Sequence, residues 1–108
     1  MTCELLCESC DIATLRFSFL GRGFSYMPTR RYRASLVMDG EVVCEDAVDF
    51  TVCDFIDVAG TAGGFLRRSG LDGSAIINAD QVRDRLYLVR EELDFDLTLH
   101  QPAIWRTT

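Results

Sequence analysis

The sequence predicts a small α+β domain in which an antiparallel sheet of four to five strands carries one or two helices on one face. Three observations predict this class. Apolar and polar residues alternate over 12–20, 31–38 and 93–100, which is the period of a half-buried strand. Asp39-Gly40 joins two apolar segments as in a hairpin. Between 52 and 91, apolar residues recur instead at helical spacing.

Length and composition indicate one domain. The chain has 108 residues, and we interpret 1–108 as a single unit whose residues 1–11 form a short helix or a frayed terminus. Hydrophobic residues make up 48 % and charged residues 26 %, which is typical of neither disordered nor membrane proteins. The first residues carry acids and lack the basic start of a secretory signal. We therefore expect a cytoplasmic protein with free thiols.

Three strands are expected in the first half. The first, 12–20, ends at Gly21 to Gly23, and the second covers 31–38. The third covers 41–50, and its alternation fails at Glu45-Asp46, where we expect a bulge or an early end. The inward residues of the first two strands are Ala13, Leu15, Phe17, Phe19, Tyr32, Ala34, Leu36 and Met38.

A helix is expected over 52–68. Thr51 stands three residues before Asp54 in the pattern of a capping box, so Thr51 is the predicted N-cap. Glycines at 60, 63 and 64 disfavour the middle of this helix and suggest a break. Gly70 suits its C-terminal end.

The second half of the chain leaves one ambiguity. Residues 74–78 suggest a short strand, and 79–91 fits either a helix or the start of a long strand. We favour a helix because Val82, Leu86 and Val89 form a helical stripe. The last strand is expected over 93–100, with Leu93, Phe95, Leu97 and Leu99 directed inward.

An acidic segment dominates the charge pattern. The formal net charge is −6, and every cation is an arginine. Between Asp39 and Asp57 lie seven carboxylates and no cation, interleaved with enough apolar residues to pack. The segment therefore predicts a folded structure with a negative face. A solvated face that only keeps the protein soluble is the alternative explanation.

This face is the predicted partner-binding site. A negative surface repels nucleic-acid phosphates and attracts basic proteins. We predict a non-enzymatic protein that occludes a basic, nucleic-acid-handling partner, as an inhibitor, immunity or phage anti-defence protein does, with no direct nucleic-acid or membrane partner. The candidate contact residues are Glu41, Glu45, Asp46, Asp49, Asp54 and Asp57, with Phe24, Tyr26 and Phe55 as apolar anchors. Homo-oligomerisation through edge strands is a further alternative.

A zinc or redox module is the alternative from another functional class. Cys3, Cys7 and Cys10 could supply three thiolates, with Cys44, Cys53 or His100 as fourth ligand. The spacing resembles the cluster motif of radical SAM enzymes, but nothing in the chain supplies their large barrel. Three small apolar residues on a helix face, or a mobile terminus, explain the pattern better. Apart from this zinc alternative, we expect no cofactor.

Four weaker patterns remain. His100 could pair with Cys44 or Cys53 as a nucleophile. The glycine stretch 60–64 could hold an anion, although close helix packing or a kink explains it better. Two carboxylate pairs, Asp94 with Asp96 and Asp54 with Asp57, could bind a cation. The basic cluster Arg30, Arg31 and Arg33, near Tyr26 and Tyr32, could contact nucleic acid, but pairing with acids is the simpler explanation.

Overall fold

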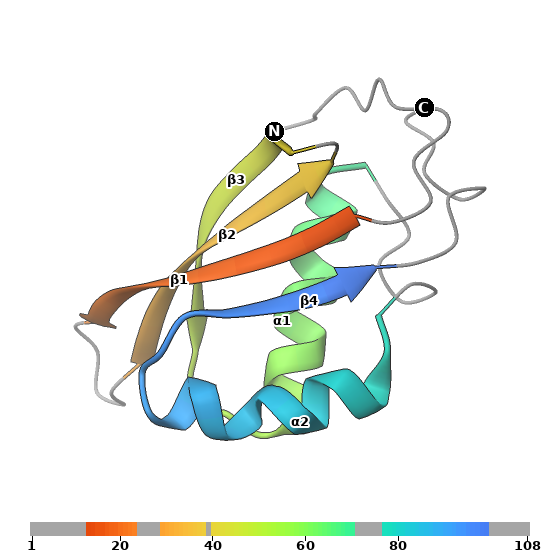
Figure 1. Ribbon diagram of the computed structural model, residues 1–108. Helices are drawn as coiled ribbons and strands as arrows, with labels where there is room; N and C mark the ends of the chain where they lie inside the picture. Colours follow the sequence, from red (N-terminus) through yellow and green to blue (C-terminus); the bar gives the residue numbers. More distant parts are fainter. Residues whose placement is uncertain (1–12, 24–28, 39, 71–76, 100–108) are drawn as a thin grey trace.

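A computed structural model describes residues 13–23, 29–38, 40–70 and 77–99, which form the expected α+β fold. The elements in chain order are β1 (Ala13–Gly23), β2 (Thr29–Met38), β3 (Glu41–Phe50), α1 (Phe55–Arg68), α2 (Ala79–Arg90) and β4 (Phe95–Leu99). The strands form one antiparallel sheet in the order β3-β2-β1-β4. Figure 1 shows α1 behind this sheet and α2 across its lower end.

Alternation along the strands determines which face the helices cover. In β1, Leu15 and Phe17 are fully buried, while Arg16 between them is exposed. The same period appears in β4, where Phe95 and Leu97 are buried and Asp96 is exposed. The apolar face therefore packs against the helices, and the opposite face stays open to solvent.

Two bulges change the register that the sequence predicts. β1 does not end at Gly21 but continues to Gly23 past a bulge between Phe19 and Gly21. Between β2 and β3, Leu36 pairs with Cys44 and Val37 pairs with Val42, which leaves residue 43 of β3 as the extra residue. The bulge in β3 therefore precedes the expected position at Glu45-Asp46, and this strand runs its full length to Phe50.

Four aromatic rings, one from each strand, meet under the helices. Phe17 of β1 stacks on Phe95 of β4 with 4.6 Å between ring centroids. Phe50 of β3 lies 5.6 Å from Phe17, and Tyr32 of β2 lies 5.3 Å from Phe50. Each such pair adds about 0.5–1.5 kcal/mol beyond the area it buries, so this cluster joins all four strands energetically.

The start of α1 lies later than expected. Asp54, not Thr51, is the N-cap, and its carboxylate accepts the backbone N–H of Asp57 at 2.8 Å. The helix then runs without a break through its three glycines to Arg68, so the expected interruption is absent. Gly70, with φ of 92°, follows directly after the C-cap, as its left-handed conformation allows.

The favoured helix over 79–91 is confirmed as α2. Asn78 caps it by accepting the backbone N–H of Gln81 at 3.0 Å. It ends in a Schellman motif, because Glu92 has φ of 60° and the Leu93 N–H reaches the Leu88 carbonyl at 2.9 Å. This turn leaves Leu93 50 % exposed, so its expected inward position is wrong.

Several expected features lie partly or wholly outside the described residues. The expected strand at 74–78 is described only at Ile77 and Asn78, and neither residue is in a strand. β4 is shorter than the expected 93–100 because the helix turn occupies Leu93. His100 is outside the described part of the chain.

The aromatic cluster predicts a large loss of stability on truncation of Phe17. Phe17→Ala removes a fully buried ring that contacts two other rings, and we expect unfolding free energy to fall by about 3–5 kcal/mol. Leu20→Ala, at a residue 47 % exposed on the same strand, is the control and should change it by less than about 1 kcal/mol. Urea unfolding of both variants checks this, and equal losses would contradict it.

Tyr32 predicts an alkaline limit to stability. Its hydroxyl donates to the Leu93 carbonyl at 2.9 Å, and burial raises its pKa from the usual 10.0 to about 12. Because the unfolded chain releases this proton first, the contribution of Tyr32 is complete below its unfolded pKa and is lost as pH rises between those two values. A variant with Tyr26→Phe and Tyr87→Phe keeps only this phenol. The ultraviolet titration of this phenol should have its midpoint about 2 pH units higher in the folded protein than in denaturant.

Candidate functional site

The predicted acidic face becomes one edge of the sheet. β3 is an outer strand in the strand order and carries Glu41, Glu45, Asp46 and Asp49, which together we call the acidic edge. The strand has no cation. No other described strand pairs with the outer side of β3, so β3 is an edge strand of the described sheet.

The acidic edge does not present its carboxylates on one face. Residues paired across an antiparallel ladder lie on the same side of the sheet. Asp46 is opposite the buried Ala34, which places it on the helix side, and Asp49 is opposite the exposed Arg31 on the open side. Glu45, next to Asp46, also lies on the open side. This division was predictable, because adjacent strand residues point to opposite faces.

Arginines of the same chain neutralise half of this edge. Arg31 donates to Asp49 through Nε at 3.1 Å and Nη2 at 3.4 Å, and this pairing raises the pKa of the guanidinium. Arg68 of α1 lies 3.7 Å from Asp46. Among the described residues, Glu41 and Glu45 have no such ion pair. The acidic edge therefore has fewer carboxylates without an ion pair than the sequence suggested.

Asp54 and Asp57 serve the backbone. Asp54 caps α1, and Oδ2 of Asp57 accepts the backbone N–H groups of Thr51, Val52 and Cys53 at 2.9, 3.0 and 2.8 Å. Both carboxylates therefore hold the turn between β3 and α1. Their part in partner binding stays a prediction, and no metal-ligating group of three among the described residues includes them.

A polar cluster beside this turn was not predicted. Arg30 donates to Cys53 Sγ at 3.4 Å and to the Arg90 carbonyl at 3.5 Å, and its Nε lies 3.9 Å from Glu92 Oε1. That Nε is buried without a hydrogen-bond partner. Cys53 and Glu92 are the described non-glycine residues with positive φ, at 61° and 60°. Arg30 therefore joins the turns before α1 and after α2.

The thiol of Cys53 is structural in this environment. It is 1 % exposed, and burial raises its pKa even though Arg30 acts in the opposite direction. A protonated and covered thiol is a poor nucleophile. Cys44 is disulfide-bonded, so the expectation of free thiols throughout is wrong for this residue.

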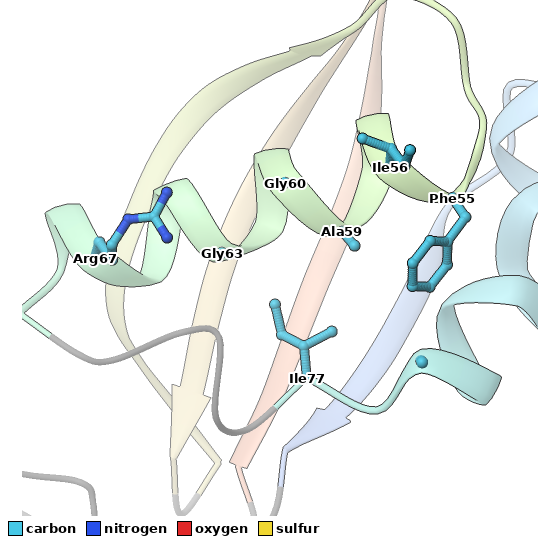
Figure 2. A pocket seen from close by; sticks show the side chains of 8 residues that line it. Phe55, Ile56, Ala59, Gly60, Gly63, Arg67 and Ile77 are labelled. Carbon is cyan, nitrogen blue, oxygen red and sulfur yellow. The ribbon is translucent and has the colours of Figure 1, made fainter.

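The outer side of α1 holds a groove that the sequence did not predict (Figure 2). It has a volume of about 470 Å³, with Phe55 at one end, Arg67 at the other and Ile77 opposite the helix. Ile56 borders it and is 78 % exposed. Phe55 is half-buried under Arg83, whose guanidinium lies 4.5 Å from its ring centroid.

The three glycines of α1 differ in burial, because Gly60 is exposed, Gly64 is half-buried and Gly63 is buried. α1 is continuous through them, and close packing does not explain Gly60, because an added Cβ there would meet no described atom within 4 Å. At Gly63 and Gly64 it would make only ordinary contacts, the nearest at 3.8 and 3.5 Å. Each glycine costs a helix about 1 kcal/mol relative to alanine. The internal packing of the described residues does not account for that cost.

The remaining candidate sites are not assembled within the part of the chain that the structure describes. Asp94 accepts the Phe19 N–H at 2.7 Å and Asp96 pairs with Arg16 at 3.6 Å, and no group of three metal-ligating residues occurs within the described ranges. The predicted basic cluster is divided, because Arg30 joins the two turns and Tyr32 is fully buried. The other candidates, Cys3, Cys7, Cys10, Phe24 and Tyr26, lie outside the described residues.

Comparisons with family models, curated proteins and solved structures find no match to this chain. None of the helices in the described residues is long and apolar enough to cross a membrane.

The turn before α1 predicts unequal costs for its two carboxylates. Asp57→Ala leaves three backbone donors without their acceptor, whereas Asp54→Ala removes one capping bond. We expect losses of about 2–3 kcal/mol for Asp57→Ala and about 1 kcal/mol for Asp54→Ala. Paired denaturant titrations measure the difference. A larger cost at Asp54 would show that the hydrogen bonds to Asp57 do not control this turn.

Proposed function

We propose that the protein is a non-enzymatic binding protein that receives an extended basic segment of another protein along the outer side of β3. One observation carries the proposal: an outer strand of ten residues bears four carboxylates and no cation. Backbone N–H and C=O groups on such a strand can pair with an added strand, and the side chains then select its sequence.

The distribution of charge on the acidic edge suits an added strand better than a flat docking surface. Glu45 and Asp49 lie on the open side, and Asp46 lies on the helix side. Successive side chains of an added strand also alternate between the two sides. Consecutive arginines or lysines in that strand would each meet a carboxylate, and complementary charge would accelerate their encounter.

The same carboxylates act against pairing between two copies of β3. An antiparallel pair of two acidic edges places carboxylates close to carboxylates, and like charges opposite one another destabilise a ladder. Charged side chains also protect outer strands from uncontrolled association. The edge therefore favours a basic partner over a second copy, which argues against the alternative of edge-strand oligomers.

The partner class follows from this chemistry. Basic extended segments and basic surfaces are common in proteins that contact nucleic-acid phosphates, and covering them would block that contact. An inhibitor, immunity or anti-defence role is the biological form that such blocking takes. The zinc or redox alternative stays a prediction, because Cys3, Cys7 and Cys10 lie outside the described residues.

Charge reversal at the edge tests the proposal. From a lysate of the source cell, the double variant Glu41→Lys, Glu45→Lys should capture at least about tenfold less basic protein than the parent. The reason is that like charges then face each other. The variant Asp84→Lys with Glu91→Lys is the control, since both residues are exposed on or next to α2 and the net charge change is identical.

The readout is quantitative mass spectrometry of the captured proteins, followed by titration with the purified partner. Loss with the edge variant and retention with the α2 variant support the proposal. Equal capture by all three proteins, or equal loss with both variants, would refute binding at the acidic edge. Circular dichroism confirms that each variant is folded.

A further inference from the structure

The groove on α1 has the size and lining of a site for a small ligand. Its volume of about 470 Å³ lies within the range of roughly 300–1,000 Å³ that is common for ligand pockets. Apolar side chains and glycine backbone form its surface, and among the described residues that line it only Arg67 is charged. Ligand sites combine such apolar walls with a few polar groups that orient the ligand. The groove shares no residue with the acidic edge.

Two glycines form the floor of the groove. Gly60 is exposed, and an added Cβ there would meet no described atom within 4 Å. Gly63 is buried, and an added Cβ there would lie 3.8 Å from Ile77 Cδ1 and 3.9 Å from Arg67 Nη1. Ile77 and the guanidinium of Arg67 therefore cover this turn of α1 (Figure 2). The open part of the groove lies over Gly60, between this turn and Phe55.

One end of the groove carries a cation without a counterion. Arg67 has no ion pair among the described residues, whereas neighbouring Arg68 lies 3.7 Å from Asp46. The guanidinium of Arg67 is instead directed back along α1 over Gly63. Guanidinium groups bind carboxylates through two parallel N–H···O bonds and are weakly hydrated, which suits them to a site beside apolar surface. This end of the groove therefore complements a single anionic head group.

The opposite end of the groove is apolar. Phe55 lies there under Arg83, which is itself paired with Asp80 at 3.3 Å and therefore offers no uncompensated charge. Ile56 stands beside it, 78 % exposed. From Ile56 to Gly63 the helix rises by about 10.5 Å, because seven residues separate them. A hydrocarbon tail of that length would cover the exposed apolar side chains while its head reaches the guanidinium.

We propose that the groove on α1 binds a free aliphatic monocarboxylate, with its tail against Phe55 and Ile56 and its carboxylate on Arg67. A neutral or cationic ligand would leave the guanidinium without a counterion. An anionic membrane surface suits the groove less well, because the chain has a net charge of −6 and the groove has one cation. Binding here goes beyond binding at the acidic edge and is independent of it, so either can fail without the other.

Octanoate, whose extended tail is about as long as the groove, is the probe. In amide NMR spectra of the parent, it should shift the signals of Gly60 and Gly63 saturably, with Kd of about 1 mM. Octylamine, with the same tail and a positive head, should bind at least about tenfold more weakly. Acetate, which lacks the tail, should give no saturable shift. Equal affinity for octanoate and octylamine, or no saturation by octanoate, would overturn the assignment.

Charge exchange at Arg67 tests the guanidinium. Arg67→Glu should lower the affinity for octanoate by about tenfold or more and make octylamine the tighter ligand. Arg68→Glu changes the net charge equally at the next residue, which lies toward Asp46, and should alter the affinity for octanoate by less than about twofold. The same loss in both variants, or no loss in Arg67→Glu, would show that Arg67 does not hold the carboxylate.

Filling the groove tests the position of the tail. Gly60→Gln should weaken octanoate by about tenfold or more and should unfold at an equal or higher temperature, because described atoms leave room for the side chain and glycine disfavours helices. Ile56→Ser, at an exposed position, should weaken octanoate by about threefold without loss of the fold. Full affinity in both variants contradicts the site. Co-sedimentation with phosphatidylglycerol vesicles, without saturation by octanoate, would indicate a membrane surface instead.

Discussion

The contact among Phe17, Tyr32, Phe50 and Phe95 is the constraint on which the other features depend. Each strand contributes one ring, and the separations between ring centroids in these pairs run from 4.6 to 6.2 Å. Because side chains alternate along a strand, fixing one ring per strand fixes the side on which the other residues lie as far as the next bulge. The positions of Glu45, Asp46 and Asp49 on β3 are therefore a consequence of where Phe50 packs.

Two turns at the end of the sheet nearest α2 hold the two helices over this cluster. There the chain enters α1 and leaves α2 through two residues with positive φ, Cys53 and Glu92. Such conformations cost a non-glycine residue of order 1–3 kcal/mol, so the surroundings must favour them. Arg30 contacts both, through Cys53 Sγ at 3.4 Å and Glu92 Oε1 at 3.9 Å. This guanidinium sets the relation between the turns, and thereby the outward side of α1.

Periodicity predicted the sheet well because burial on one side imposes a strict alternation. The strands over 12–20, 31–38 and 41–50 and the helix over 79–91 could be placed from spacing alone, with differences of a few residues at their ends. Local signals predicted the helix ends less well. Thr51 and Asp54 both precede an acid by three residues, and both capping patterns fit the sequence, so only tertiary packing decides between them.

The candidate site was harder to predict, for a different physical reason. A run of acids suggests one negative face, yet Glu45 and Asp46 are adjacent in a strand and point to opposite sides. The arginines that pair with Asp49 and Asp46 come from β2 and α1, and no sequence spacing links them to the acids. The glycines of α1 are a sequence feature that could have indicated the groove. The position of Ile77 opposite α1 depends on the tertiary structure and could not be predicted from spacing.

The acidic edge of β3 and the groove on α1 differ in the chemistry that they offer to a partner, and Arg68 contributes to this difference. It lies 3.7 Å from Asp46, and both side chains are about half exposed, so their attraction adds little stability. Its effect is on the distribution of charge. It neutralises Asp46 on the helix side of β3 and leaves Arg67 as the outward charge of α1. A basic strand therefore finds its uncompensated acids at Glu41 and Glu45, while the groove on α1 offers an apolar surface with a single cation at its border.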